Sequence, residues 1–260
     1  MIHGLALCAG VGGLELGLRL ALGSRYRTVC HVEREGFAAA TLVARMEDAT
    51  LGPAPIWDDV RSFDARPWRG VVDLVSAGIP CQPVSAAGKR RHLDDDRWLW
   101  SDVARIVSEC SPRVVFVENV PGLVRHGLRH VWGDLRAMGY RVEAGFFSAA
   151  EVGAPHRRQR VFILADADGG RLSAQWEPKH GSIEGTHGHE SIGSGPDREF
   201  PWPGWPDGRF ADGLEPAIRR ASDGGPDRLD ERLAALGNGV VPLVAAHAFR
   251  TLAARMVAGA

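Results

Sequence analysis

The sequence predicts an α/β protein with a parallel sheet covered by helices and a small, loop-rich insert. Over the first 165 residues, short runs rich in β-branched apolar side chains alternate with longer stretches whose apolar residues recur at helical spacing. From residue 166 to about residue 230 that alternation stops, and glycine, proline, histidine and charged residues dominate. Such a change of composition indicates a second structural unit within the chain.

Seven short runs are the candidate strands of this sheet, at residues 4–8, 28–33, 56–57, 71–77, 114–118, 141–148 and 161–165. The stretches between them predict helices at residues 14–22, 37–47, 98–110 and 128–138. Near the end of the chain, a turn signal at 237–242 precedes an alanine-rich stretch at 243–256, which predicts a closing helix packed back on the first domain. We therefore divide the chain into an α/β domain (1–165), an insert (166–230) and a C-terminal segment (231–260).

Composition and charge place few limits on the partners of this protein. The chain has 31 basic and 32 acidic residues, a balance that argues neither for nor against nucleic acid, because a binding face can be locally basic. Basic residues cluster at 89–91, 125–130 and 156–160, although solvated surface charge explains each cluster equally well. With no basic and apolar leader, and no apolar run of the roughly 20 residues that span a bilayer, we expect a cytoplasmic protein without membrane contact.

The cysteines argue against both a metal site and a disulfide framework. The four of them, at positions 8, 30, 81 and 110, are widely scattered and lack the short paired spacings of zinc sites. We expect reduced thiols and no bound metal.

A glycine-rich loop at residues 8–13 (the glycine loop) lies directly between the first candidate strand and the first candidate helix. Glycine there allows a tight turn and lets a ligand approach the backbone amides, although many α/β proteins turn on glycine without binding anything. Glu33, at the end of the second strand and roughly 20 residues on, strengthens the case, because a carboxylate in that place accepts hydrogen bonds from ribose hydroxyls. The loop and Glu33 together predict an adenosine-containing cofactor.

The third strand ends in two further carboxylates. Asp58 and Asp59 could each accept a hydrogen bond from an adenine amino group. The alternative for Asp58 is the N-cap of a helix.

Cys81 follows the fourth strand and has Pro80 on one side and Pro83 close on the other. Most lone cysteines are inert core residues, but the flanking prolines fix this loop and argue against ordinary core packing. Open α/β sheets bind their ligands at the carboxyl ends of their strands, where Cys81 is expected. A nucleophile is therefore the better interpretation.

Two more groups are expected at the same edge of the sheet. Glu118 ends the fifth strand, with a capping or surface glutamate as the alternative. Arg158 and Arg160 lie immediately before the last strand, where alternate side chains can point into one crevice.

Taken in order, these motifs resemble those of the DNA cytosine-5 methyltransferases, in particular the compact enzymes of phage and restriction-modification type. The resemblance covers nearly the whole chain except the insert: the glycine loop, a Pro-Cys-Gln loop at 80–82, Glu-Asn-Val at 118–120, the paired arginines and a final motif at 237–242. It implies a Rossmann-like sheet that binds S-adenosylmethionine, and a target-recognition role for the insert. Cys8 departs from the pattern, because the family often has phenylalanine there against adenine.

The resemblance also implies which residues bind the cofactor, with Glu33 at the ribose and Asp59 at the adenine. The full implied set is Cys8, Ala9, Gly10, Val11, Gly12, Gly13, Glu33, Arg34, Asp59, Val60, Pro80, Leu99, Asn238 and Val240.

The implied reaction methylates C5 of a cytosine after the Cys81 thiolate adds to C6. Glu118 is expected to hold the cytosine N3 and its exocyclic amine, supplying a proton or a strong hydrogen bond. Arg160, helped by Arg158, is expected to hold the cytosine O2 and to position Glu118, although Arg158 could equally be a structural strut.

Double-stranded DNA is the implied partner, with the target base turned out of the stack. The residues expected at the DNA are Gln82, Ser85, Arg97, Trp202, Trp205 and Arg209. A hydrophobic anchor within the insert explains Trp202 and Trp205 equally well. We also expect a monomer, and a cognate restriction endonuclease as a possible second partner. Two rival functions are an RNA cytosine-5 methyltransferase and a non-catalytic nucleic-acid-binding relative.

Overall fold

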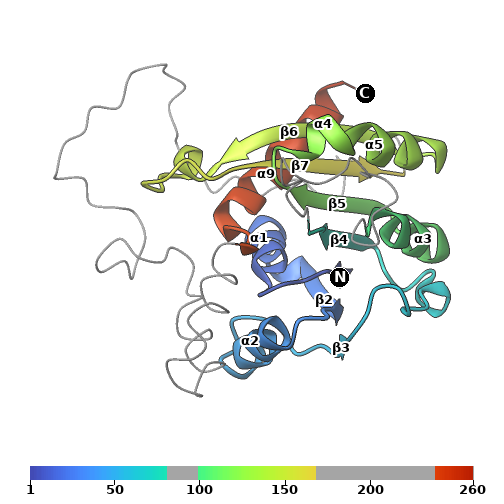
Figure 1. Ribbon diagram of the computed structural model, residues 1–260, viewed down its shortest axis with the longest axis vertical. Helices are drawn as coiled ribbons and strands as arrows, with labels where there is room; N and C mark the ends of the chain where they lie inside the picture. Colours follow the sequence, from blue (N-terminus) through green and yellow to red (C-terminus); the bar gives the residue numbers. More distant parts are fainter. Residues whose placement is uncertain (81–98, 168–237, 260) are drawn as a thin grey trace, which may run out of the picture.

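The computed structural model describes residues 1–80, 99–167 and 238–259. Its centre is a seven-stranded sheet in the order β3-β2-β1-β4-β5-β7-β6, visible as stacked arrows in Figure 1. The strands are β1 (Ile2–Leu7), β2 (Tyr26–Val32), β3 (Ile56–Trp57), β4 (Leu74–Gly78), β5 (Val114–Asn119), β6 (Arg141–Ser148) and β7 (Gln159–Asp166). The α/β fold and all seven predicted strands are confirmed.

The helices also follow the sequence pattern. The longer ones are α1 (Gly13–Leu22), α2 (Gly36–Glu47), α3 (Trp100–Cys110), α5 (Leu128–Ala137) and α9 (Pro242–Ala258). The short elements are α4 (Leu123–His126) and the 3-10 turns η1 (Gly23–Arg25), η2 (Arg66–Trp68) and η3 (Ala149–Val152). The sequence did not predict these short elements, because one helical turn is too brief to show an apolar period.

The sheet is not parallel throughout, which corrects the expectation of a parallel sheet. Strand β7 runs antiparallel to both of its neighbours, β5 and β6. The connection from β6 to β7 is short and contains only η3 and a turn. Parallel neighbours need a crossover of about a dozen residues or more, usually a helix, so this link forms a hairpin instead.

Strand β4 begins later than the apolar run predicted. Val71 and Val72 extend the run in sequence, but their N–H groups donate to the carbonyl of Trp68 in the turn after η2. Their amides are therefore engaged in a turn, and the strand starts at Leu74. At the other end of the domain, β7 continues to the buried Asp166, and the N–H of Ala167 donates to the carbonyl of Arg113.

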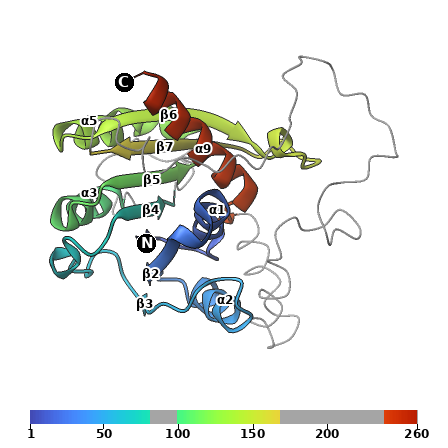
Figure 2. The same cartoon turned by 180° about the vertical axis from the view of Figure 1, so that it is seen from behind.

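The two largest hydrophobic clusters among the described residues cover the sheet. One joins α3 and α5 to the sheet through Val103, Ile106 and Leu135, and the other joins α1 and α9 to it through Leu18 and Phe249. Figures 1 and 2 show α9 lying beside α1, and α3 beside α5, in both views. In the parts of the chain that the structure describes, no helix is long and apolar enough to cross a membrane.

Glycines allow the close approach of α1 and α9. A Cβ at Gly17 would lie 2.5 Å from the Cβ of Ala245 and 2.7 Å from the carbonyl oxygen of Pro242. A Cβ at Gly13 would collide with the carbonyl oxygen of Val240. The segment before α9 is thus held directly against the start of α1, next to the glycine loop.

Candidate active site

The carboxyl ends of four parallel strands, β1, β2, β4 and β5, meet at one edge of the sheet. Gly78 at the end of β4 is the register partner of Glu118 near the end of β5. The glycine loop follows β1 and Glu33 follows β2. Because open α/β sheets bind ligands at this edge, it is the candidate site.

The Glu33 carboxylate accepts one short hydrogen bond from the glycine loop and one from the backbone that follows it. The N–H of Gly10 donates to Glu33 Oε2 at 2.7 Å, and the N–H of Glu35 donates to Glu33 Oε1 at 2.7 Å. The loop takes positive φ at Cys8 (50°), Gly10 (55°) and Gly12 (78°). The two glycines adopt this conformation without a steric penalty, whereas residues with a Cβ, such as Cys8, rarely do. Burial raises the pKa of the Glu33 carboxyl, while the two backbone N–H groups lower it in part.

Asp59 shapes the turn that follows β3. Its Oδ1 accepts the N–H of Arg61 at 2.9 Å, and its carbonyl accepts the N–H of Ser62 at 3.1 Å. No helix begins at Asp58 among the described elements, so the N-cap alternative for that residue is wrong. The Asp59 side chain remains partly exposed at the edge of the sheet.

Glu118 and Arg160 form an ion pair across the antiparallel strands β5 and β7. Arg160 Nε lies 3.0 Å from Glu118 Oε1, and Glu118 is only 6% exposed. Among the described residues, no donor is aligned for a hydrogen bond to this oxygen, so the two groups form an ion pair without a well-formed hydrogen bond. Burial raises the pKa of the Glu118 carboxyl to about 7, against the opposing effect of the Arg160 and Arg158 charges. The carboxyl can therefore gain or lose a proton near neutral pH.

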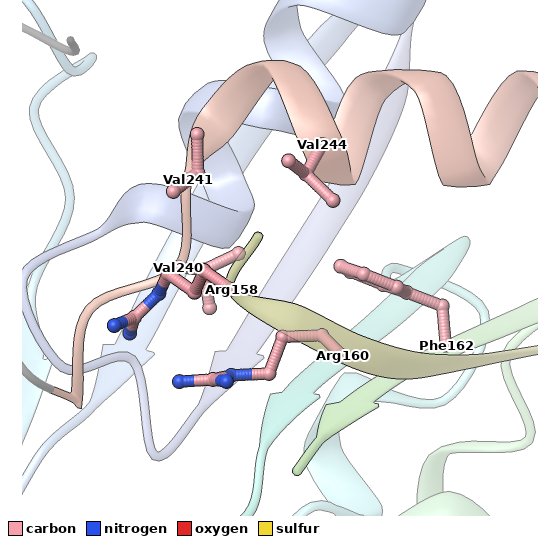
Figure 3. Close-up of a pocket in the computed structure, with 6 residues that line it drawn as sticks. All are labelled: Arg158, Arg160, Phe162, Val240, Val241 and Val244. Carbon is pink, nitrogen blue, oxygen red and sulfur yellow. The ribbon is translucent and has the colours of Figure 1, made fainter. Parts of the chain in front are cut away.

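The two arginines of β7 and the turn before it have different contacts. Both arginines line a small pocket together with Phe162 and Val244. Figure 3 shows the two guanidinium groups extending to the same side, with Phe162 and Val244 on the other side of this pocket. Arg158 Nη2 donates to the carbonyl of Gly239, which ties this turn to the segment before α9. Arg160, in contrast, lies against Glu118.

The backbone just before Pro80 is held by a residue to which the sequence did not assign a role. The side-chain amide of Asn119 donates to the carbonyl of Ile79 at 3.0 Å, and its Oδ1 accepts the N–H of Val120 at 2.8 Å. Asn119 is therefore a strut between β5 and the residue that precedes Pro80. The sequence feature that could have identified Asn119 is its position inside the Glu-Asn-Val motif.

The first turn of α3 is held by another contact that the sequence did not predict. The indole N–H of Trp100 donates to Asp134 Oδ2 at 2.7 Å, joining the first turn of α3 to α5. Leu99, just before it, is half-buried against the larger core.

Burial suppresses the acidity of the three cysteines that the structure describes. It raises the pKa of the Cys8 and Cys110 thiols to about 12 and that of the Cys30 thiol to about 11. Such thiols remain neutral near pH 7 and are poor nucleophiles. None of these three thiols is therefore a good candidate for a nucleophile.

The structure brings together most of the predicted cofactor set, namely the glycine loop, Glu33, Pro80 and Val240, along the edge that also carries Glu118. Cys81, the predicted nucleophile, lies outside the described residues, as do the residues predicted at the DNA: Gln82, Ser85, Arg97, Trp202, Trp205 and Arg209. No cluster of three or more potential metal ligands occurs within residues 1–80, 99–167 and 238–259.

The fold and the edge define a Rossmann-like α/β protein of the methyltransferase class. Solved structures agree with that class. A prophage protein of E. coli, described as a DNA modification methyltransferase, superposes with a TM-score of 0.52 at 25% identity, covering 64% of this chain and 47% of the other. The Dnmt2 methyltransferase of S. pombe has the same fold at 22% identity, with a TM-score of 0.52 over 64% of this chain and 51% of its own.

The chain belongs to the C-5 cytosine-specific DNA methylase family, whose model matches residues 2–191. Among similar proteins, the Type II methyltransferase M.NgoMIV of Neisseria gonorrhoeae is 33% identical over 165 residues, which is 62% of this chain and 50% of that protein. M.PspPI of Psychrobacter sp. is 35% identical over 164 residues, which is 61% of this chain and 38% of that protein. The chain thus spans about half or less of the length of these relatives.

Proposed function

We propose that this protein is a DNA cytosine-5 methyltransferase that transfers a methyl group from S-adenosylmethionine to a cytosine turned out of duplex DNA. One observation carries the proposal: a buried Glu118, paired with Arg160, lies beside the strand end that leads through Pro80 to Cys81. Membership of the family supports the same activity.

Cys81 is the nucleophile in this proposal. Its thiolate forms a bond to C6 of cytosine, which makes C5 nucleophilic enough to take the methyl group. The hydrogen at C5 then leaves as a proton and the sulfur–C6 bond breaks, which restores the aromatic ring and the free cysteine. The high pKa values of the other three thiols support Cys81 as the reacting residue.

Glu118 stabilises the negative charge that develops on the cytosine ring. With its pKa raised to about 7 by burial, it is protonated in a large fraction of molecules near neutral pH and can donate to N3. The Arg160 guanidinium limits that rise and holds the carboxyl from the side of β7, and its remaining N–H groups can donate to O2 of the base. Arg158 acts through the carbonyl of Gly239, as a strut between the catalytic turn and the C-terminal segment.

The glycine loop fits an adenosyl cofactor. The N–H groups of Gly10 and Glu35 each donate to one oxygen of Glu33, and a carboxylate has further lone pairs that could accept from ribose hydroxyls. A Cβ at Gly10 would meet nothing within 4 Å among the described residues, which leaves open space over the loop. Asp59 would accept from the adenine amino group. When bound, S-adenosylmethionine supplies an electrophilic methyl group.

The remaining parts of the proposal concern DNA. The insert at 166–230 would choose the target sequence, and the segment at 231–260 would return to the cofactor loop. Gln82, Ser85 and Arg97 would contact the DNA around the flipped base, with Trp202, Trp205 and Arg209 in the insert. A monomer is expected, and a cognate restriction endonuclease is a candidate partner in the cell.

Trapping the covalent intermediate tests the proposal. Fluorine at C5 blocks proton release after methyl transfer, so duplex DNA with 5-fluorocytosine at target sites and S-adenosylmethionine should give a denaturation-resistant complex. The cross-linked peptide should contain Cys81, and Cys81→Ser should form no complex, because a serine hydroxyl is far less ionised than a thiol.

The same assay separates the alternatives. A complex that maps to Cys8, Cys30 or Cys110, or that persists in Cys81→Ser, contradicts the mechanism. Structured RNA that outcompetes duplex DNA for methyl transfer would identify an RNA methyltransferase. Absence of methyl transfer to either polynucleotide would identify a non-catalytic relative.

A further inference from the structure

We infer that Arg105 is a positioning residue for the cofactor, and that it orients Asp59 through the peptide group between Val60 and Arg61. The inference rests on the proposed function, in which Asp59 accepts from the adenine amino group. Arg105 itself belongs to α3, far from Asp59 in the sequence.

A single peptide group connects the two side chains. Its carbonyl, on Val60, accepts from Arg105 Nη2 at 2.9 Å. Its N–H, on Arg61, donates to Asp59 Oδ1 at 2.9 Å. Because a peptide group is planar and rigid, the direction of the N–H follows from the direction of the carbonyl. The guanidinium that holds the carbonyl therefore also sets where the Asp59 carboxylate rests.

Arg105 makes further contacts with the same turn. Its Nη2 lies 3.3 Å from the carbonyl oxygen of Arg61, and its Nη1 donates to the carbonyl of Phe63 at 2.9 Å. A planar guanidinium with several fixed donors can hold three carbonyls at once, which a single lysine ammonium cannot do with the same geometry. The turn after β3 is thus organised around one side chain.

The guanidinium is itself held in place by acidic residues on its own helix. Arg105 Nη1 lies 3.0 Å from Glu109 Oε1, and the N–H of Ala65 donates to Glu109 Oε2 at 2.9 Å. Asp102, one turn earlier, lies 3.8 Å from Arg105 Nη2. The Arg105 side chain is only 36% exposed, so it is less free to rotate than an arginine in open solvent.

The location of α3 gives this contact a second consequence. The helix begins just after residues 81–98, which carry Cys81, and the Trp100–Asp134 hydrogen bond fastens its first turn. The same helix therefore carries both that first turn and Arg105, which holds the turn that would read the adenine. Arg105 thus connects the adenine side of the site to α3.

The test compares two ligands that differ only at the adenine amino group. Affinities of the full chain for S-adenosylhomocysteine and for its 6-deamino analogue, which has hydrogen in place of the amino group, are measured by calorimetry. The parent should prefer the amino form by about tenfold, the scale of a hydrogen bond to a charged group, and Asp59→Ala should lose that preference. Arg105→Met should lose most of it as well.

Arg69→Met is the matched control. Arg69 also joins the loop after β3 to α3, but it donates to the carbonyls of Ser108 and Glu109 at the other end of the helix. It should keep the tenfold preference, even where it lowers the melting temperature. Arg105→Lys keeps the charge but not the planar set of donors, so its preference for the amino form should lie between those of the parent and Arg105→Met. If the methionine variant does not fold, the lysine variant tests the inference in the same way.

The outcomes separate this inference from the proposed function. A preference unchanged in Arg105→Met, or lost equally in Arg69→Met, overturns the inference alone. A parent that binds both ligands equally overturns it too, while the methyltransferase proposal stands. A parent that binds neither ligand overturns both.

Discussion

At the residue scale, buried carboxyl groups are the clearest source of testable chemistry. Glu15, in the first turn of α1, is 1% exposed, and its Oε1 accepts from the Ser76 hydroxyl at 2.8 Å. Its Oε2 has no hydrogen-bond partner among the described residues. Burial raises the pKa of this carboxyl from 4.5 to about 7, although the Ser76 hydroxyl and the charge of Arg45 act to lower it. Glu15 is therefore costly to ionise in the folded protein.

Glu15→Gln should stabilise the protein at high pH. Between about pH 4.5 and pH 7 the unfolded chain ionises Glu15 while the folded chain keeps its proton, so the free energy of unfolding of the parent falls as pH rises. Glutamine keeps a hydrogen-bond acceptor and does not titrate. In urea unfolding at pH 8, the free energy of unfolding of the variant should exceed that of the parent by up to about 3 kcal/mol, and this gap should shrink toward pH 4.5. An identical gap at both pH values would rule out a titrating Glu15.

Glu118 should control the alkaline side of the pH–rate profile. Its pKa is about 7 in the free protein, and the proposed role needs the protonated form. The value of kcat/KM for DNA should therefore decline as pH rises through about 7, because the ionised fraction grows. In Glu118→Gln the rate should be lower by about 100-fold or more, and this decline should be absent. A decline that persists in the variant assigns that ionisation to another group.

At the element scale, the contact between α1 and α9 depends on missing side chains. In a helix interior, alanine is usually more stable than glycine by about 0.5–1 kcal/mol. At Gly17 the added methyl would meet the backbone and side chain of α9 at 2.5–2.7 Å, so Gly17→Ala should lower the free energy of unfolding by about 1–3 kcal/mol. At the exposed Gly133 of α5, an added Cβ would meet nothing within 4 Å.

Gly133→Ala is therefore the control for the helix contact. It should raise the free energy of unfolding by about 0.5–1 kcal/mol, through helix propensity alone. Chemical denaturation of both variants measures the two effects side by side. If Gly17→Ala were as stable as Gly133→Ala, the close packing of α9 on α1 would be wrong.

At the scale of the whole molecule, we expect the part of the chain that selects the DNA target sequence to be separable from the part that transfers the methyl group. The described residues with proposed catalytic roles, Glu118 and Arg160, lie on the sheet, and β7 remains part of the sheet as far as Asp166. A graft should therefore begin at residue 168, two residues later than the composition suggested, so that it leaves β7 intact. Residues 168–230 placed in a related methyltransferase should transfer the recognition sequence, as mapped by methylation of cellular DNA. A folded, active chimera that keeps the specificity of its host would refute this role of the insert.

Much of the architecture was already determined by the sequence. Strands and helices could be predicted because apolar periodicity is local, and each of the seven strands lies within a few residues of its predicted position. The residues at the strand ends, such as Glu33 and Glu118, could be predicted as site candidates for a related reason, since parallel strands bring their carboxyl ends to one edge.

Which groups far apart in the chain come into contact could not be read from the sequence. Periodicity does not show which strands pair or in which direction, so the antiparallel position of β7 was not predicted, and that position brings Arg160 to Glu118. The contact of Arg158 with Gly239 and that of Arg105 with Val60 join residues 81 and 45 positions apart. Such hydrogen bonds depend on the packing of whole elements, and no local pattern in the sequence records them.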